Sequence, residues 1–309
     1  MPPEHAIEIR SLSKLFGNVH AVDGLDLKVE RGEIFGFLGP NGAGKTTTIK
    51  MMMGLTKPSG GKVFVLGKKA GADAVGARRK IGYLPERVAF YDNLTAVQTM
   101  HFFCDLKEAD RSEALPLLEE VGLKDAADRK VGTYSKGMTQ LLGVAQAMIG
   151  EPSLYILDEP TSGLDPRWVK VVRDRMRALN DKGATVLFSS HILSEVQSLS
   201  HRVAIIDKGK LVAEDTVANL NTHLNIRPRL ELVIPGLDGK VPKQVLGLAG
   251  VDGAVVKGDS LVVTCDGAAR AAVVSAVTEA GLKISDMRTM EPSLEEAFVK
   301  LVSNDRGAA

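Results

Sequence analysis

Cysteine and long apolar runs are both scarce in this chain of 309 residues. Its two cysteines, Cys104 and Cys265, lie far apart and fit no metal-binding spacing, so we expect free thiols in a reducing compartment. No run approaches the ~18 to 20 apolar residues that span a bilayer, and the first residues lack a charged-then-apolar signal pattern. We therefore expect no segment of this chain to cross a membrane.

The chain also lacks an excess of either charge. Its 39 Lys and Arg residues against 38 Asp and Glu residues give a formal net charge of +1. Such a balance argues against general electrostatic attraction to nucleic acid or to an anionic membrane. It does not exclude a local patch of positive charge. The length and the 44% content of hydrophobic residues are enough for a large core and for more than one domain.

A glycine-rich segment at 39–47 fits the pattern G-x-x-x-x-G-K-[ST]; it follows the apolar run 34–38, expected to be a strand, and precedes residues 48–53, expected to be helical. Glycines let backbone N–H groups point inward at a helix N-terminus, where they cradle phosphate. Lys45 would then reach the β- and γ-phosphates, and the Thr46 hydroxyl would hold Mg²⁺. The alternative is an ordinary strand, turn and helix. The predicted nucleotide-binding residues are Gly39, Pro40, Asn41, Gly42, Ala43, Gly44, Lys45, Thr46 and Thr47.

The apolar stretch 154–157 ends in two carboxylates, Asp158 and Glu159. This pattern indicates a buried strand that delivers both side chains to the end of a sheet. Asp158 could hold a metal through water, and Glu159 could polarise an attacking water. A solvated strand end is the alternative, and the phosphate loop earlier in the chain favours the catalytic interpretation.

Residues 134–138, Tyr-Ser-Lys-Gly-Met, precede an amphipathic helix whose apolar face carries Leu141, Val144, Ala145 and Met148. Taken alone, the segment is typical of an ordinary helix with Ser135 as its N-cap. In context it resembles the signature sequence, usually L-S-G-G-Q, of ATP-binding-cassette (ABC) ATPases. Residues 162–165 resemble the D-loop of that family, and residues 189–191 resemble its switch-histidine segment.

Five motifs in the family's order identify residues 5–220 as a member of the ABC ATPases. The resemblance implies ATP and Mg²⁺ as ligands, Glu159 and His191 as catalytic residues, and Phe16 against the adenine. It also implies contacts to nucleotide from Ser135, Lys136, Gly137 and Asp165. Phe16 as an ordinary core residue and His191 as a structural histidine are the alternatives.

The chain departs from the family pattern at three places. Glu86 stands where the Q-loop usually has glutamine, so it keeps an oxygen for Mg²⁺ but adds negative charge. With Thr46 and Asp158 it completes the predicted metal ligands. Lys136 and Met138 replace the usual glycine and glutamine of the signature, and Leu141 stands where many relatives have arginine.

The order of elements predicts an α/β fold. Short strands at 7–9, 25–29 and 62–66 form a β lobe, residues about 95–150 are helical, and parallel strands follow at 154–157, 185–189 and 202–206. The resemblance implies a P-loop ABC domain at 5–220 with an antiparallel β lobe and a helical subdomain.

The pattern of expected strands and helices changes near residue 220, which predicts a separate small α+β domain at 221–309. Its expected strands are 230–234, 254–257, 260–264 and 283–288, with a helix at 268–280 and a last helix that begins with a capping box of Ser293 and Glu296. It resembles the C-terminal domain of ATPase subunits of ABC-2-type exporters. We expect either a passive enlargement of a dimer interface or a regulatory, substrate-sensing role.

Two classes of function follow from the resemblance. The first is a homodimeric ATPase subunit of an ABC-2-type exporter, held on the cytoplasmic face of the membrane by a separate permease subunit. The second is a soluble ABC ATPase that acts on ribosomes or DNA. The single cassette and the short distance from Lys45 to Ser135, with no room for a long coiled coil, favour the transporter, and no nucleic-acid partner is expected. A narrower resemblance is to the ATPase that serves nitrous-oxide-reductase maturation.

Overall fold

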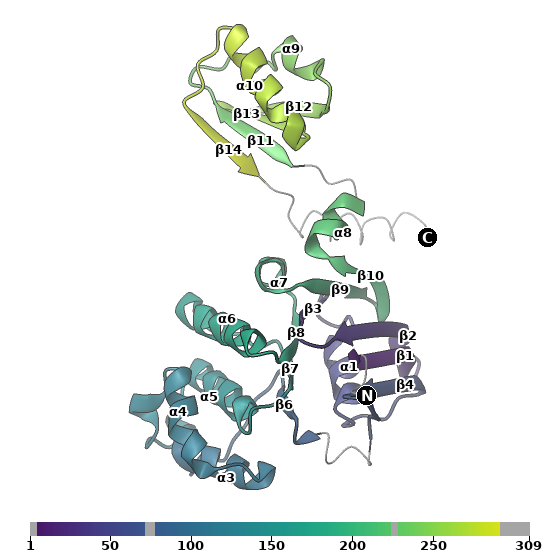
Figure 1. Ribbon diagram of the computed structural model, residues 1–309, viewed down its shortest axis with the longest axis vertical. Coiled ribbons are helices and arrows are strands. Elements are labelled where there is room, and N and C mark those ends of the chain that lie inside the picture. The colour runs from purple at the N-terminus through teal and green to yellow at the C-terminus, as the bar shows by residue number, and fades with distance from the viewer. Residues whose placement is uncertain (1–4, 72–77, 224–227, 291–309) are drawn as a thin grey trace. The chain divides into compact units, whose positions relative to one another are not determined.

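The computed structural model describes residues 5–71, 78–223 and 228–290. The chain divides into two compact units, Met1–Val217 and Ala218–Ala309, and Figure 1 labels the elements of both. Among the described residues, no helix is both long and apolar enough to cross a bilayer. Cys104 and Cys265 are buried free thiols, as predicted.

A six-stranded sheet with the order β10-β9-β3-β8-β7-β6 forms the centre of the first unit. Its strands are β3 (Ile34–Leu38), β6 (Ile81–Leu84), β7 (Leu154–Asp158), β8 (Thr185–Ser190), β9 (Arg202–Asp207) and β10 (Lys210–Thr216). Only the β9–β10 pair is antiparallel. Every residue of β3, β7 and β8 is buried, as expected for parallel strands covered on both faces. The carboxyl ends of these three neighbouring strands therefore meet at one edge.

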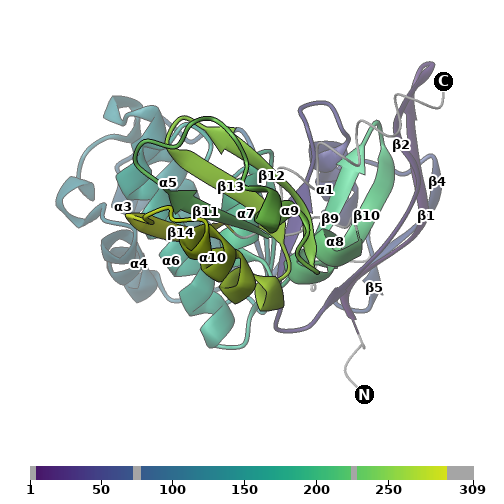
Figure 2. The ribbon, with the colours of Figure 1, turned by 90° about the horizontal axis from the view of Figure 1, so that it is seen from above.

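An antiparallel sheet with the order β2-β1-β4-β5 lies at one side of this unit (Figure 2). Its strands are β1 (His5–Phe16), β2 (Val19–Glu30), β4 (Gly60–Val65) and β5 (Lys68–Lys69). The predicted short strands at 7–9 and 25–29 are in fact parts of a long hairpin. Ser11, with a φ of 45°, lies at a register shift, and its N–H donates to Asp26 (2.8 Å). The bulge lets the strand continue where the apolar alternation breaks.

Helices complete the first unit. They are α1 (Lys45–Met52), α3 (Ala96–Lys107), α4 (Ala114–Glu120), α5 (Lys136–Met148), α6 (Pro166–Asp181) and α7 (Leu193–Leu199), with short 3₁₀ turns at Arg111–Glu113, Lys124–Ala126 and Val131–Thr133. Helix α1 packs between the two sheets, where Ile49 belongs to a core that both sheets share. The helices predicted within 95–150 are confirmed as α3, α4 and α5. Leu141, in place of the family's arginine, is fully buried.

Helix α8 (Val217–His223) leads into the second unit, which has the order β11 (Arg229–Val233), α9 (Lys243–Leu246), β12 (Val251–Lys257), β13 (Ser260–Cys265), α10 (Arg270–Glu279) and β14 (Asp286–Met290). A 3₁₀ turn at Gly267–Ala269 precedes α10. The strands form an antiparallel sheet in the order β12-β13-β11-β14. Helices α9 and α10 share a core with one face of it (Figure 2).

This β-α-β-β-α-β order is the ferredoxin-like arrangement, which agrees with the predicted α+β class. The sequence did not predict helix α9, and β14 begins three residues after the expected start. The predicted last helix with its capping box of Ser293 and Glu296 lies outside the described residues.

Candidate nucleotide site

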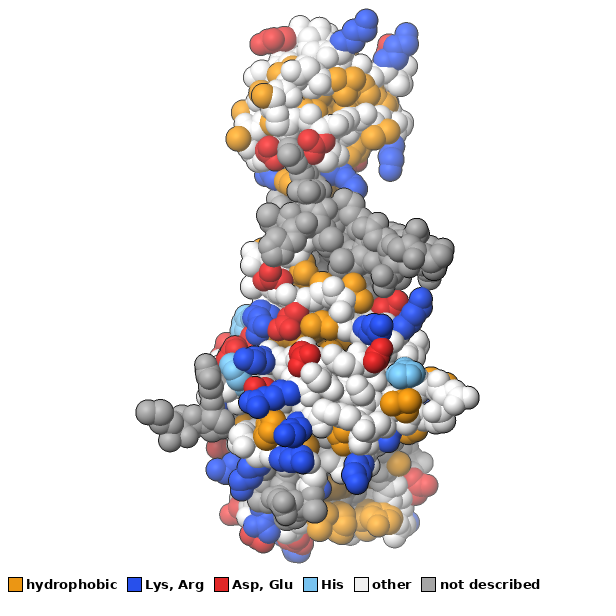
Figure 3. Space-filling view, turned by 90° about the vertical axis from the view of Figure 1, so that its right-hand side faces the viewer, with side chains coloured by type: hydrophobic (Ala, Val, Ile, Leu, Met, Phe, Trp, Pro, Cys, Tyr) orange, Lys and Arg blue, Asp and Glu red, His pale blue; other side chains and the backbone are white. Residues whose placement is uncertain are grey.

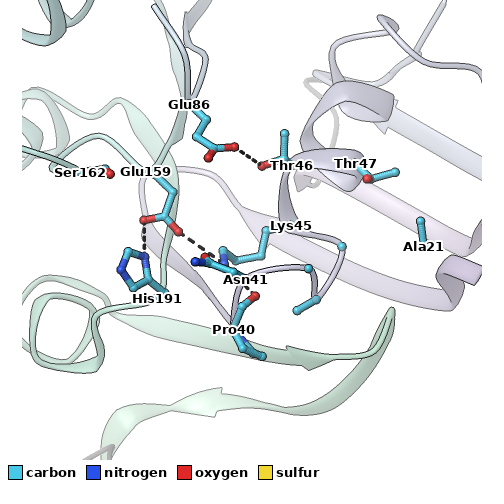
Figure 4. A pocket seen from close by; sticks show the side chains of 13 residues that line it. Ala21, Pro40, Asn41, Lys45, Thr46, Thr47, Glu86, Glu159, Ser162 and His191 are labelled. Atoms are coloured by element: carbon cyan, nitrogen blue, oxygen red, sulfur yellow. Dashed lines mark hydrogen bonds and ion pairs between the residues drawn. The ribbon is translucent and has the colours of Figure 1, made fainter. Parts of the chain in front are cut away.

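A cavity of about 270 Å³ lies where the phosphate-loop segment meets the ends of β7 and β8 (Figure 4). Its lining comes from five separate stretches of the first unit: Ala21, Pro40, Asn41, Gly42, Ala43, Gly44, Lys45, Thr46, Thr47, Glu86, Glu159, Ser162 and His191. Most of the residues predicted from the glycine-rich pattern thus surround one space, together with both predicted catalytic residues.

The glycines of the loop are required by its backbone. Gly42 and Gly44 have φ values of 82° and 104°, which L side chains rarely adopt. A Cβ added to Gly44 would lie only 2.3 Å from the carbonyl oxygen of Ala21. One added to Gly39 would lie 2.4 Å from the carbonyl oxygen of Ile206. Helix α1 begins directly after Gly44, so the N–H groups of its first turn have no partners within the helix. An anion can accept hydrogen bonds from these groups.

Lys45 is buried and holds its ammonium group inside the loop. Its Nζ donates to the carbonyl oxygens of Gly39 (2.6 Å) and Pro40 (3.2 Å). The same atom lies 3.4 Å from Oε1 of Glu159. A compact positive charge is therefore fixed at the centre of the cavity.

Asp158 is completely buried at the end of β7. Its Oδ1 accepts a hydrogen bond from Ser189 (2.6 Å), whereas its Oδ2 has no partner. Burial raises the pKa of the Asp158 carboxyl, and the nearby hydroxyl groups of Ser189 and Thr46 act in the opposite direction. The Thr46 hydroxyl also donates to Glu86 (3.3 Å). An unpartnered carboxylate oxygen beside a hydroxyl and a second carboxylate fits a hard cation such as Mg²⁺.

Glu159 contacts both Lys45 and His191 in the cavity. Its Oε2 lies 2.8 Å from Nδ1 of His191, and its Oε1 faces Lys45. An ionised carboxylate only accepts, so Nδ1 carries the hydrogen of this bond. The backbone φ of Glu159 is 50°, an uncommon value for a residue with a side chain, and its N–H donates to Ser189 (2.9 Å). The strained backbone turns this carboxylate back over the phosphate loop.

The predicted nucleotide contacts of the signature and of the end of the D-loop do not line this cavity, whereas Ser162 at the start of the D-loop does. These predicted contacts are Ser135, Lys136, Gly137 and Asp165. The Ser135 hydroxyl accepts from the Met138 N–H (3.2 Å) as the N-cap of α5, and Asp165 accepts from the Trp168 N–H (3.2 Å) as the N-cap of α6. The side chain of Lys136 packs against Gly163 of the D-loop, because a Cβ added to Gly163 would lie 2.9 Å from Nζ of Lys136. The signature thus lies against the D-loop, and the predicted contacts Ser135, Lys136, Gly137 and Asp165 do not line the phosphate-loop cavity of their own chain.

Phe16 also lies outside the cavity lining, at the end of β1, with 53% of its surface exposed. Nζ of Lys14 lies 4.8 Å above its ring. The structure therefore excludes the core alternative for Phe16, because a core residue would be covered. Its predicted contact with adenine stays a prediction.

Sequence reasoning assigned no role to three residues of the site, although Ser162 lies in the predicted D-loop and Ser189 in the predicted switch-histidine segment. Ala21 and Ser162 line the cavity, and Ser189 bonds to both Asp158 and Glu159. A polar residue at the end of the apolar strand β8 is a signal that could have identified Ser189. Ala21 has no such signal, because only the packing of β2 against the loop brings it there.

Comparisons with known proteins agree with this geometry. The family described as "ABC transporter" matches residues 22–162. The linearmycin resistance ATP-binding protein LnrL of Bacillus subtilis is 32% identical, over 96% of this chain and 97% of its own. The daunorubicin resistance ATP-binding protein DrrA3 of Streptomyces coeruleorubidus is 36% identical, over 97% of each chain.

Solved structures show the same fold. A structure described as the ATP binding subunit of an ABC transporter superposes with a TM-score of 0.67 and 31% identity, over 72% of this chain and 94% of its own. The ATP-binding cassette MJ0796, solved as a dimer bound to ADP and Pi, has a TM-score of 0.64 at 24% identity, over 68% of this chain and 98% of its own. The predicted fold class is confirmed. The chain belongs to the ATP-binding proteins of the ABC transporter family, a family of ATP-binding ATPases.

Proposed function

We propose that this chain is the ATP-hydrolysing subunit of an ABC-2-type exporter and drives a separate membrane subunit from the cytoplasmic face. The observation that carries the proposal is the position of Glu159, whose carboxylate lies between Lys45 and His191 in the phosphate-loop cavity. Relatives named for linearmycin resistance, daunorubicin resistance and bacitracin transport support an exporter. The reported relatives give no support to nitrous-oxide-reductase maturation.

In this proposal each side chain has a separate task. The N–H groups of the loop and of the first turn of α1 bind the phosphates, and Lys45 balances the charge that develops on them. Glu159 accepts a proton from the attacking water, and His191 holds that carboxylate in position. Phosphoryl transfer depends mostly on positioning and charge stabilisation, which fits the fixed and buried side chains of Lys45 and Glu159.

Thr46, Asp158 and Glu86 would hold Mg²⁺, which neutralises charge on the phosphate oxygens when it is bound. The donor set fits, because Oδ2 of Asp158 is buried without a partner and Thr46 bonds to Glu86. Two carboxylates and a hydroxyl leave positions for water and phosphate oxygens, as Mg²⁺ sites usually require.

We further propose a homodimer in which the signature of one copy completes the site of the other. Ser135, Lys136, Gly137 and Asp165 lie outside the cavity of their own chain, which supports contact with nucleotide on a second copy. A cassette related by fold, MJ0796, was solved as a dimer.

An alternative action on ribosomes or DNA receives little support from the surface. Lys and Arg side chains gather on one face of the first unit (Figure 3), and the antiparallel sheet carries Arg10 opposite Lys62. However, Glu8 neutralises Arg10 through two hydrogen bonds of 2.9 Å. The guanidinium of Arg10 also lies 5.2 Å from the ring centroid of Phe64, so this aromatic ring is not a free platform for stacking of bases.

The permease would dock on an apolar patch of the helical subdomain, which we define as Tyr91, Phe102 and Leu106. All three are exposed, Tyr91 at 63%, and the rings of Tyr91 and Phe102 lie 6.1 Å apart. Exposed aromatic residues are typical anchors of protein interfaces. The C-terminal unit, residues 221–309 in our domain assignment, would be an accessory domain, either a passive part of the dimer or a regulatory sensor.

Expression with a candidate membrane subunit tests the proposal. We expect the two to co-purify, and we expect the permease in vesicles to change the rate of ATP hydrolysis by this chain. Purified chain that hydrolyses ATP but binds no membrane protein and instead sediments with ribosomes would favour the alternative.

A further inference from the structure

Glu195 is a buried carboxylate that neither sequence motifs nor the cavity lining include. It lies in the first turn of α7 with 8% of its surface exposed. A charged side chain is rarely buried unless other groups compensate for its lost hydration, so its partners indicate its role.

Two hydroxyl groups donate to the same oxygen of this carboxylate. Oγ1 of Thr161 lies 2.7 Å from Oε2 of Glu195, and Oγ of Ser190 lies 3.3 Å from it. Both donors are themselves buried. Hydrogen bonds to a charged acceptor are about twice as strong as neutral ones, and burial increases their strength.

The two donors belong to the two segments that deliver the catalytic pair. Thr161 lies two residues after Glu159, just before Ser162 of the cavity lining, and Ser190 directly precedes His191. Ser190 is also the register partner of Leu38, the last residue before the phosphate loop. A shift of either hydroxyl would therefore move one member of the bond between Glu159 and His191 relative to the other.

We propose that Glu195 is a positioning residue for ATP hydrolysis. Its Oε2 clamps the segment after β7 to the end of β8, and this clamp keeps Glu159 and His191 at hydrogen-bonding distance. The inference rests on the proposed roles of those two residues. Because a misplacement of about 1 Å in an active site can cost about 100-fold in rate, loss of the clamp should lower kcat by a factor of that order.

Steady-state ATPase assays of the full chain test the clamp. We expect Glu195→Ala to lower kcat about 100-fold with little change in KM. Glu195→Gln should recover most of the rate, because an amide oxygen can accept both hydroxyls. Thr161→Val should lower kcat in the wild type but little further in Glu195→Ala, since residues that share one interaction are not additive.

Ser198→Ala is the matched control on the same helix. The Ser198 hydroxyl donates to the backbone carbonyl of Glu195 (2.9 Å) and accepts from Arg173 (2.6 Å), so the variant perturbs α7 without touching the carboxylate. We expect it to keep near wild-type kcat. Thermal melting and binding of a non-hydrolysable ATP analogue should be nearly unchanged in Glu195→Gln and Thr161→Val.

Several results would overturn the inference. An unchanged kcat in Glu195→Ala would mean that the clamp does not position the pair. If Glu195→Ala weakened binding of the ATP analogue as much as it lowered kcat, Glu195 would have a general structural role. If the effects of Thr161→Val and Glu195→Ala on kcat were fully additive, the two residues would not share an interaction. Hydrolysis that is insensitive to Glu159→Gln would instead overturn the proposed function itself.

Discussion

Glu159 lies between Lys45 and His191, with its Oε2 2.8 Å from Nδ1 of His191 and its Oε1 3.4 Å from Nζ of Lys45. The three side chains come from the end of β7, the loop after β8 and the start of α1. One carboxylate thus connects the phosphate-binding and water-activating parts of the proposed site, and variants at these positions should separate binding from turnover.

The first prediction concerns the catalytic base. Glu159→Gln removes the proton acceptor but keeps the size of the side chain, so we expect ATP binding to persist while hydrolysis slows by about 10²–10⁴-fold. Single-turnover hydrolysis and size-exclusion chromatography with ATP and Mg²⁺ would measure the rate and the accumulation of an ATP-bound dimer. Lys45→Ala is the contrasting variant and should lose ATP binding itself. Near-normal turnover in Glu159→Gln would reject this role.

A second prediction concerns stability at Asp158. Burial raises the pKa of this carboxyl in the folded protein, so the folded state binds its proton more tightly than the unfolded chain does. The free energy of unfolding should therefore fall as the pH rises from the pKa of Asp158 in the unfolded chain to its raised pKa in the folded protein. Asp158→Asn keeps an acceptor for Ser189 and removes this penalty.

We expect Asp158→Asn to raise the free energy of unfolding at neutral pH and to abolish Mg²⁺-dependent hydrolysis. Urea unfolding at several pH values would measure the difference, which should shrink as the pH approaches 4. A variant that is less stable than the wild type at pH 7 would contradict the assignment of a costly buried charge.

The third prediction tests the metal ligand at the Q-loop position. Glu86 lies beside Thr46, and a charged oxygen attracts Mg²⁺ more strongly than an amide oxygen does. We therefore expect Glu86→Gln to need a higher Mg²⁺ concentration for half-maximal ATPase activity. Identical Mg²⁺ titrations of both proteins would mean that Glu86 does not touch the metal.

The fourth prediction tests the composite site by complementation. Ser135→Asp keeps an N-cap for α5 but places a negative charge where the γ-phosphate of a second copy would bind. We expect Ser135→Asp and Lys45→Ala to be inactive separately. Their mixture should recover part of the activity, because a mixed dimer contains one site with an intact loop and an intact signature. Absence of recovery in dimers shown to be mixed would argue that each chain hydrolyses ATP alone.

The fifth prediction concerns the apolar patch of Tyr91, Phe102 and Leu106. Because Tyr91 is exposed, Tyr91→Asp should leave folding and basal ATPase activity nearly unchanged but abolish co-purification with the membrane subunit. Leu55→Asp is a matched control, since Leu55 is similarly exposed but lies in the loop after α1. A coupled complex that survives Tyr91→Asp would move the docking surface elsewhere.

The sequence by itself determined the chemistry of the candidate site and the class of the fold. The glycine pattern around Lys45 depends on local backbone geometry, and the apolar run before Asp158 depends on burial of a parallel strand. Both requirements act over a few adjacent residues, so they are visible in the order of amino acids. The helix that follows Ser135 was predictable for the same reason, from its periodicity.

Tertiary structure alone decided which of these residues meet. The strand order β3-β8-β7 brings the phosphate loop, His191 and Glu159 to one edge, although they are far apart in the chain. Pairing with β2 extends β1 past Ser11, and Phe16 is exposed at the end of β1. The contact of α7 with the segment after β7 and with the end of β8 buries Glu195 between Thr161 and Ser190. Such contacts join segments that are distant in the chain. Local periodicity cannot predict them, because it shows which face of an element is buried but not which element covers that face.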